Sequence, residues 1–231
     1  MHNYPRDLVG YANQPPNPNW PNGARLALQI VLNYEEGAEN NVLHGDQGSE
    51  TFLSEIINAE SFSDRHMSME SLYEYGSRVG FWRLHRLLTE MSIPVTVFGV
   101  GMAMERNPAA VEAMLKADWE IASHAYRWIS HQLMSVEQEQ EQIALAFETH
   151  ERITGSPPLG WYTGRDSPNT RRLILQKGGL LYDSDSYADD LPYWHSGDWG
   201  HHLIVPYTLD TNDMRFAAAQ GFNSGTQFYD Y

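Results

Sequence analysis

Short apolar segments alternate with segments of helical periodicity along most of the chain. The first two apolar segments are apolar at nearly every position, which is typical of strands covered on both faces. Strands are predicted at residues 26–32, 93–101, 119–124, 159–163, 180–183 and 203–209. The alternation of strands and helices predicts parallel βαβ units, arranged as an open sheet or a barrel.

Apolar residues at helical spacing, together with cap residues, predict the helices between these strands. They are expected at residues 80–91, 107–117, 136–153 and 168–175. Asn107, Pro108 and Ser135 start two of them, because these residues suit the first turn of a helix. Gly155 ends the longest one. We interpret the acidic run 137–141 as the solvated face of that helix.

Two long segments follow neither pattern. Residues 1–24 contain five prolines, which forbid a regular helix and predict an extended arm laid over the body. Residues 38–75 are polar and weakly periodic, and a loop of that length is usually functional or part of an oligomer contact. We therefore expect a homo-oligomer, with a tetramer as one arrangement.

The composition excludes several classes of protein. The 231 residues carry a net charge of -15, so nucleic acid and anionic membranes are poor partners. The absence of cysteine excludes disulfides and thiolate zinc sites, which leaves histidine and carboxylates as strong metal ligands. No segment resembles a membrane helix or a signal peptide. We expect one cytoplasmic domain that covers residues 1–231.

Polar side chains follow the predicted strands. They are Glu35 and Glu36 after the first strand, His124 after the third, Tyr162 and Arg165 after the fourth, Asp183 and Asp185 after the fifth, and Asp210, Asn212 and Asp213 after the sixth. In a barrel the carboxyl ends of the strands meet around one pocket, where barrel enzymes hold their chemistry. No glycine-rich phosphate-binding motif opens a helix. The pattern therefore favours a barrel enzyme over a nucleotide-binding sheet.

Five segments carry a resemblance to a known family. They are residues 33–37, 123–128, 160–165, 182–193 and 210–216. Over essentially its whole length the chain resembles the polysaccharide deacetylase (NodB-homology) superfamily, and it is most similar to the cofactor-independent allantoinase branch. The resemblance implies an α/β fold, a distorted (β/α) barrel. Six strands leave two open edges, so we expect a further strand and helix beyond these residues.

The chain departs from the pattern of the metal-dependent members. Glu35 and Glu36 stand where those members have two aspartates, the catalytic base and a metal ligand. Trp128 stands where the second histidine of a His-x-x-x-His pair belongs, and Gly160 stands at the motif arginine. An indole N–H donates a hydrogen bond and cannot ligate a metal. We therefore expect a site that works without a metal or another cofactor.

The resemblance implies hydrolysis of the cyclic amide of allantoin to allantoate, in purine breakdown. Glu35 is the expected general base, and His124 would protonate the leaving nitrogen or donate to the oxyanion. Glu36 would orient His124 or a ring N–H, and the adjacent charges would raise the pKa of one carboxyl. Trp128 would fill the vacated metal space. The residues expected to bind the substrate are Trp128, Tyr162, Arg165, Asp210, Asn212 and Asp213.

Alternative functions and roles stay open. The chain could be a zinc-dependent N-deacetylase of a polysaccharide or peptidoglycan, or a barrel protein without catalysis. Glu35 and Glu36 could be a solvated pair of loop charges. His124 and Trp128 could be core residues, and Arg165 could pair with Asp166 or a helix end.

Three further histidines receive no role in the site. Neighbouring His201 and His202 point to opposite sides of a strand, and we interpret both as surface or interface residues. His131 follows His124 by seven residues, and nothing in the sequence connects it to the site.

Overall fold

The computed structural model describes residue 4, residues 6–217 and residues 221–231, and seven strands of this part form one sheet. In spatial order they are β1 (Ile30–Tyr34), β2 (Val95–Gly99), β3 (Glu120–Ser123), β4 (Gly160–Trp161), β5 (Tyr182–Asp183), β7 (Gly200–Ile204) and β6 (Tyr193–Gly197). Neighbouring strands run parallel except β6 and β7, which form an antiparallel hairpin.

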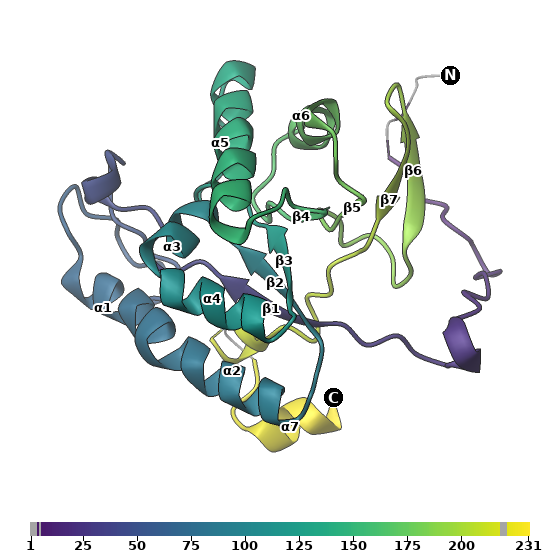
Figure 1. Cartoon of the computed structure of the whole chain (residues 1–231), viewed down its shortest axis with the longest axis horizontal. Helices are drawn as coiled ribbons and strands as arrows, with labels where there is room; N and C mark the ends of the chain where they lie inside the picture. Colours follow the sequence, from purple (N-terminus) through teal and green to yellow (C-terminus); the bar gives the residue numbers. More distant parts are fainter. Residues whose placement is uncertain (1–3, 5, 218–220) are drawn as a thin grey trace.

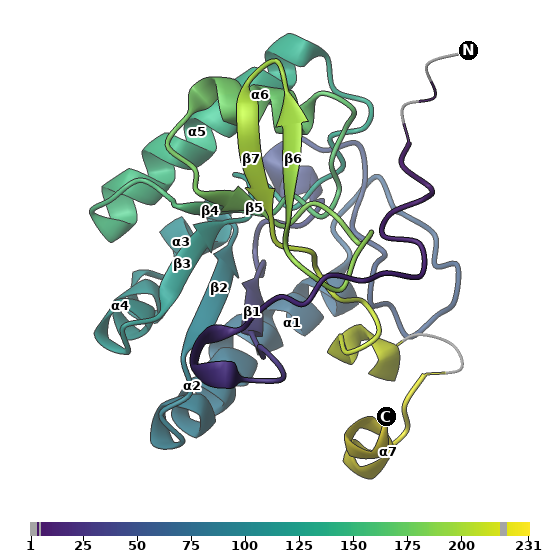
Figure 2. The same ribbon diagram turned by 90° about the vertical axis from the view of Figure 1, so that its right-hand side faces the viewer.

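Helices connect the strands and surround the outside of the sheet (Figures 1 and 2). They are α1 (Met67–Tyr75), α2 (Phe81–Glu90), α3 (Gly101–Arg106), α4 (Pro108–Lys116), α5 (Val136–Thr154), α6 (Thr170–Lys177) and α7 (Gly225–Asp230). A π-helical turn, Gly76–Gly80, joins α1 to α2, and 3-10 turns lie at Pro21–Gly23, Val42–His44 and Asp213–Phe216. No described helix combines the length and apolar character needed to cross a membrane.

Alternation along the strands separates the core from the site. In β2, Val95 and Val97 belong to the main apolar core, which includes Tyr34, Met104 and residues of the helices. Phe98 lies on the opposite face of β2 and packs with Tyr162 in a smaller buried cluster. Successive side chains of a strand point to opposite faces, so one face is covered by helices and the other carries the candidate site.

The predicted α/β fold with parallel strands is confirmed, with two corrections. The sheet of the described residues is open, with β1 and β6 at its edges, and does not close into a barrel. Strand β6 was missed, because its sequence Tyr-Trp-His-Ser-Gly is neither continuously apolar nor alternating. The sixth predicted strand corresponds to β7, which begins at Gly200 and ends at Ile204.

The amino-terminal third of the chain differs from its prediction. The predicted strand at residues 26–32 begins only at Ile30, and Leu26 and Leu28 are exposed. The described side chains of residues 4–19 are also exposed, so the arm is not packed on the body as expected. An apolar run signals burial only when a partner surface covers it, and the described residues supply none here.

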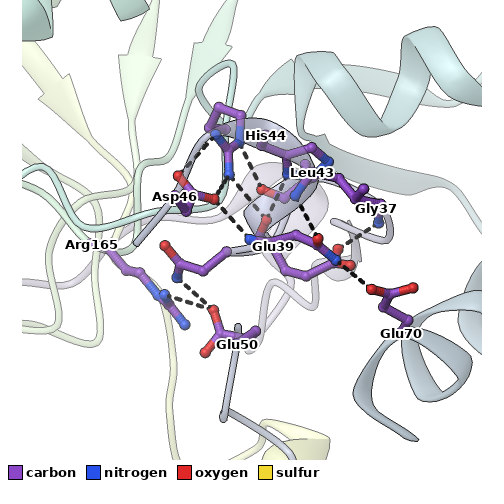
Figure 3. Close-up of polar contacts among 12 residues, drawn as sticks. Gly37, Glu39, Leu43, His44, Asp46, Glu50, Glu70 and Arg165 are labelled. Carbon is purple, nitrogen blue, oxygen red and sulfur yellow. Dashed lines mark hydrogen bonds and ion pairs between the residues drawn. The ribbon is translucent and has the colours of Figure 1, made fainter. Parts of the chain in front are cut away.

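The segment 38–75 is more ordered than its weak periodicity indicates. It contains helix α1 and a loop whose polar groups bind one another (Figure 3). Arg127 is buried at the centre of this loop and donates hydrogen bonds to the carbonyls of Ala38 and Glu39 and to Asp46. The loop is therefore fixed against the segment that follows β3.

Candidate active site

The segments that follow the strands meet at one end of the sheet. The Tyr162 N–H donates to the carbonyl of Ser123 at 2.9 Å, and the Tyr207 N–H donates to that of Ser186 at 2.8 Å. The backbone N–H of Trp128 donates to the carbonyl of Ala38 at 3.1 Å. These contacts connect the segments at the ends of β1, β3 and β4 with one another, and the loop after β5 with the loop after β7, as expected for the carboxyl ends of parallel strands.

Glu35 and His124 form the centre of this region. His124 Nε2 lies 3.1 Å from Glu35 Oε1, and His124 Nδ1 lies 2.8 Å from the carbonyl oxygen of Tyr162. A carbonyl can only accept, so Nδ1 carries a hydrogen and Nε2 faces the carboxyl group. His124 is 1 % exposed, whereas the Glu35 side chain is 18 % exposed. The pair therefore presents its carboxyl side to solvent and its imidazole to the protein.

This arrangement defines where a proton can move. With Nδ1–H held by the carbonyl, Nε2 of a neutral imidazole presents its lone pair to Oε1, so the contact can take up one proton and share it between the carboxyl group and the imidazole. A carboxylate that takes a proton from water can pass it to the imidazole without a change of partner. The contact is thus suited to general base and general acid steps in sequence.

A stack of aromatic rings supports the imidazole. The Tyr162 ring lies 4.9 Å from those of both Phe98 and His124, and the Tyr207 ring is nearly parallel to it at 4.7 Å. The Tyr162 hydroxyl pairs with that of Tyr187 at 2.9 Å. Burial raises the pKa of Tyr207 to about 12 and raises the pKa of Tyr162 as well, so both phenols remain neutral hydrogen-bonding groups.

Trp128 and Arg165 lie against each other in the segments that follow β3 and β4. The Arg165 guanidinium carbon is 3.7 Å from the centre of the Trp128 ring, a cation–π contact. Arg165 also approaches buried Glu50, with Nη1 3.5 Å from Oε2 (Figure 3). The alternative pairing of Arg165 with Asp166 is therefore wrong. Trp128 is 8 % exposed and belongs to the main apolar core, and the guanidinium of Arg165 packs on its ring.

The cluster expected at residues 210–213 is only partly at the site. Asn212 donates to the Tyr207 hydroxyl at 2.8 Å, and Tyr207 stacks on Tyr162. Asp210 is exposed and accepts from the Thr211 N–H, and Asp213 is exposed in a 3-10 turn. In this structure Asn212 is joined to the site, whereas Asp210 and Asp213 face solvent.

Glu36 points away from His124. Its Oε2 accepts the Glu35 N–H at 3.1 Å, and its carboxyl packs against Gly76. Both ring nitrogens of His124 are taken by Tyr162 and Glu35, so the expected orientation of His124 by Glu36 is wrong. Burial first, and the charge of Glu35 next among the raising causes, raise the pKa of Glu36 to about 7. The direction expected from adjacent carboxylates is confirmed, with burial as the larger cause.

Glu36 should make the stability of the protein depend on pH. Its pKa is higher in the folded than in the unfolded protein, so its contribution is full below about pH 4.5 and declines as the pH rises through about 7. Each unit of pKa corresponds to roughly 1.4 kcal/mol. We measure the free energy of unfolding in urea at about pH 5 and at about pH 8. The decrease from the lower to the higher pH should be smaller for Glu36→Gln than for the wild type. An unchanged loss would contradict this, and exposed Glu60→Gln is the control.

Gly76 should be indispensable to the position of Glu36. A Cβ at Gly76 would lie 2.8 Å from Cδ and Cγ of Glu36 and closer still to Oε1. We expect Gly76→Ala to lower the free energy of unfolding by about 1–3 kcal/mol, measured by urea unfolding. Gly80, in the same π-helical turn, is the matched control because its Cβ would lie 3.9 Å from the nearest atom. Equal stability of the two variants would contradict the expectation.

The carboxylates at the end of β5 and just after it bind neighbouring segments of the fold. Asp183 is fully buried and binds Arg171, with Nε 2.9 Å from Oδ2. His202 is also buried, 3.2 Å from the same carboxylate, so its interpretation as a surface residue is wrong, whereas His201 is exposed. Asp185 Oδ1 accepts the N–H groups of residues 163 and 164, which fixes the loop after β4. Burial raises the pKa of Asp185 to about 7.

The donor groups of the described residues do not fit a catalytic metal. No three histidine or carboxylate side chains among residues 4, 6–217 and 221–231 are grouped as a metal site requires. His124 Nδ1 carries a hydrogen for the Tyr162 carbonyl, and Nε2 faces Glu35 at hydrogen-bond distance. A metal ligand needs a free lone pair at the ion, so this pair would have to separate to bind one.

Sequence reasoning missed three residues at the site. Glu50 contacts Arg165, Tyr207 stacks on Tyr162, and Asn33 approaches the Tyr207 hydroxyl at 3.5 Å. Asn33 Oδ1 is buried and has no partner among the described residues. Asn33 directly follows the predicted strand 26–32 and could have been chosen on that signal, whereas Tyr207 falls inside the predicted strand 203–209. Glu50 has no such signal, because it comes from the long polar loop.

The chain matches the family model described as polysaccharide deacetylase over residues 65–180. A relative from Schizosaccharomyces pombe, a "Putative polysaccharide deacetylase", is 41 % identical over 98 % of this chain and 77 % of its own length. A solved structure of "Puue Allantoinase" is 56 % identical, with a TM-score of 0.95 over 99 % of this chain and 76 % of that chain.

A second solved structure is equally similar. A "probable Polysaccharide deacetylase" from Pseudomonas aeruginosa is 57 % identical, with a TM-score of 0.94 over 99 % of this chain and 77 % of that chain. Two closely similar structures thus carry names of different hydrolases. The chain belongs to the polysaccharide deacetylase family and is a hydrolase of that family.

Proposed function

We propose that the protein hydrolyses the cyclic amide of allantoin, or of a closely related ureide, without a metal ion. The contact between Glu35 and His124 carries this proposal. Glu35 can accept a proton and His124 can donate one, and the two groups lie 3.1 Å apart. The same contact occupies His124 Nε2, the nitrogen that a metal ion would need. The similarity to the structure called "Puue Allantoinase" supports the choice of substrate.

The proposed reaction begins with a water molecule held by Glu35. As the carboxylate removes a proton, the water oxygen forms a bond to the amide carbon, and the carbonyl oxygen gains negative charge. The proton moves from Glu35 to His124 Nε2 and then to the ring nitrogen. The C–N bond breaks as that nitrogen is protonated, which leaves a carboxylic acid and an open-chain urea group. Hydrogen-bond donors near the carbonyl stabilise the oxyanion.

The substrate's ureido group needs fixed donors and acceptors. Arg165, held on Trp128, supplies N–H donors for a carbonyl oxygen. Asn33 Oδ1 is a buried acceptor without a partner among the described residues, and it suits a ring N–H. Tyr162 supplies a flat neutral surface next to His124. We assign no substrate contact to Asp210 or Asp213.

Homo-oligomerisation and a cytoplasmic location remain predictions.

Deacetylation of an N-acetylated glycan is the second candidate. The names of the relative from Schizosaccharomyces pombe and of the structure from Pseudomonas aeruginosa favour it. Both reactions hydrolyse an amide, so Glu35 and His124 would serve either one. The two candidates differ in the size of the substrate and in the need for a metal ion.

One assay separates the two candidates. The purified protein is incubated with allantoin and with an N-acetylglucosamine oligomer, each with and without a chelator. We expect ring opening of allantoin at the same rate in both conditions, because no step depends on a metal. Release of acetate that stops with the chelator and returns with zinc would instead establish the deacetylase. Turnover of neither substrate would contradict both candidates.

A further inference from the structure

Glu139 lies in the acidic run that was expected to be a solvated helix face. Its side chain in α5 is instead 0 % exposed, although Gln140 and Glu141 beside it are exposed. Burial of a carboxylate is unfavourable unless it accepts hydrogen bonds. The groups that donate hydrogen bonds to Glu139 therefore show which segments its buried carboxylate holds together.

Three side chains donate to the Glu139 carboxylate, and they come from two separate segments. Ser167 Oγ donates to Oε2 at 2.6 Å, and the Thr170 hydroxyl donates to Oε1. His131 Nδ1 lies 3.1 Å from the same oxygen, Oε1, and donates to it. Since His131 follows β3 and Ser167 follows β4, one carboxylate joins the loops that also carry Trp128 and Arg165.

Arg165 lies between these attachment points. The backbone N–H of His131 donates to the Arg165 carbonyl at 2.9 Å. His131 therefore binds Glu139 through its ring and the Arg165 backbone through its own backbone. Two residues later, Ser167 is bound directly. Arg165 is thus held at its own carbonyl and through Ser167, and its guanidinium reaches Trp128 and Glu50. Arginine has a long side chain, and a fixed backbone reduces the freedom that substrate binding would otherwise have to remove.

We propose that Glu139 is the positioning residue for Arg165. Through His131 and Ser167 it clamps the loop after β4 to the loop after β3, and it places the guanidinium over Trp128 where a substrate carbonyl binds. The role of Arg165 toward the substrate rests on the proposed function. The clamp itself is a property of the fold and can be measured without a substrate.

Glu139→Gln tests the clamp, because the amide keeps one acceptor oxygen for three donors, and the NH2 group that replaces the other oxygen donates and cannot accept. We expect amide hydrogen exchange in residues 129–134 and 165–170 to become about 10-fold faster or more, with the rest of the chain unchanged. We also expect KM for allantoin to rise about 10-fold with little change in kcat, since a binding contact is weakened. In an Arg165→Ala background the same substitution should leave KM unchanged.

Two variants make these results decisive. Glu141→Gln is the matched control, an exposed glutamate of the same helix, and it should match the wild type in every measurement. Ser167→Ala removes one donor and gives a weaker form of both effects if Glu139→Gln does not fold. Unchanged exchange in both loops overturns the proposal. Faster exchange in a protein that does not turn over allantoin supports the clamp and rejects the proposed function alone.

Discussion

Glu35→Gln is expected to lower kcat/KM for allantoin about 10³-fold, the size typical of a lost general base. The amide is close in shape to the carboxyl group, but it cannot take a proton from water. It also cannot exchange a proton with His124 Nε2, which lies 3.1 Å from Glu35 Oε1. Steady-state kinetics of ring opening, with the fold checked by circular dichroism, measure the effect.

The control for this variant is Glu60→Gln, which makes the same chemical change in the exposed part of the loop after β1. It should retain the wild-type rate. If Glu35→Gln keeps more than a tenth of that rate, then Glu35 is not the base. A large loss in both variants would instead point to a general effect of charge on the acidic protein.

His124→Asn is expected to lower kcat/KM at least about 10²-fold while the protein remains folded. The Asn amide nitrogen can take the place of Nδ1 and keep the hydrogen bond to the Tyr162 carbonyl, which holds the loop after β4. The group that faces Glu35 is lost. We expect the free energy of unfolding to fall by only about 1–2 kcal/mol, because part of a buried ring is removed.

His124→Gln is the companion variant. It can place an amide near Glu35 but cannot carry a proton, so it should be as inactive as His124→Asn. Activity near the wild-type level in His124→Gln would show that hydrogen bonding, and not proton transfer, is the role of His124. The double variant with Glu35→Gln should lose little more than either single variant, since residues that act as a unit are not additive.

The candidate site illustrates how a buried network supports a few reacting groups. Glu35 and His124 contribute the proposed chemistry, but their geometry depends on the Tyr162 carbonyl and on the aromatic stack beneath it. Glu36, next in sequence, serves the packing against Gly76. Two adjacent carboxyls of the same type therefore have different environments, which is how proteins assign different roles to identical groups.

The local sequence determined most of the helices and central strands, and it indicated which polar residues follow the strands. Strong caps and helical spacing located α4 and α5 to within one or two residues, because short-range hydrogen bonds and apolar periodicity decide a helix. The strand-end rule selected Glu35, His124, Tyr162 and Arg165 before any contact was known, since parallel strands direct their carboxyl ends to one edge. The family followed from short motifs that are spread along most of the chain.

Tertiary structure alone decided the partners of these residues. Glu139 belongs to an acidic run that local reasoning places in solvent, and only the approach of two distant loops buries it. The pairing of Arg165 with Trp128 and Glu50 joins three segments far apart in sequence. Burial and hydrogen bonding between remote segments depend on the whole fold, and a periodic pattern records only the geometry of one element.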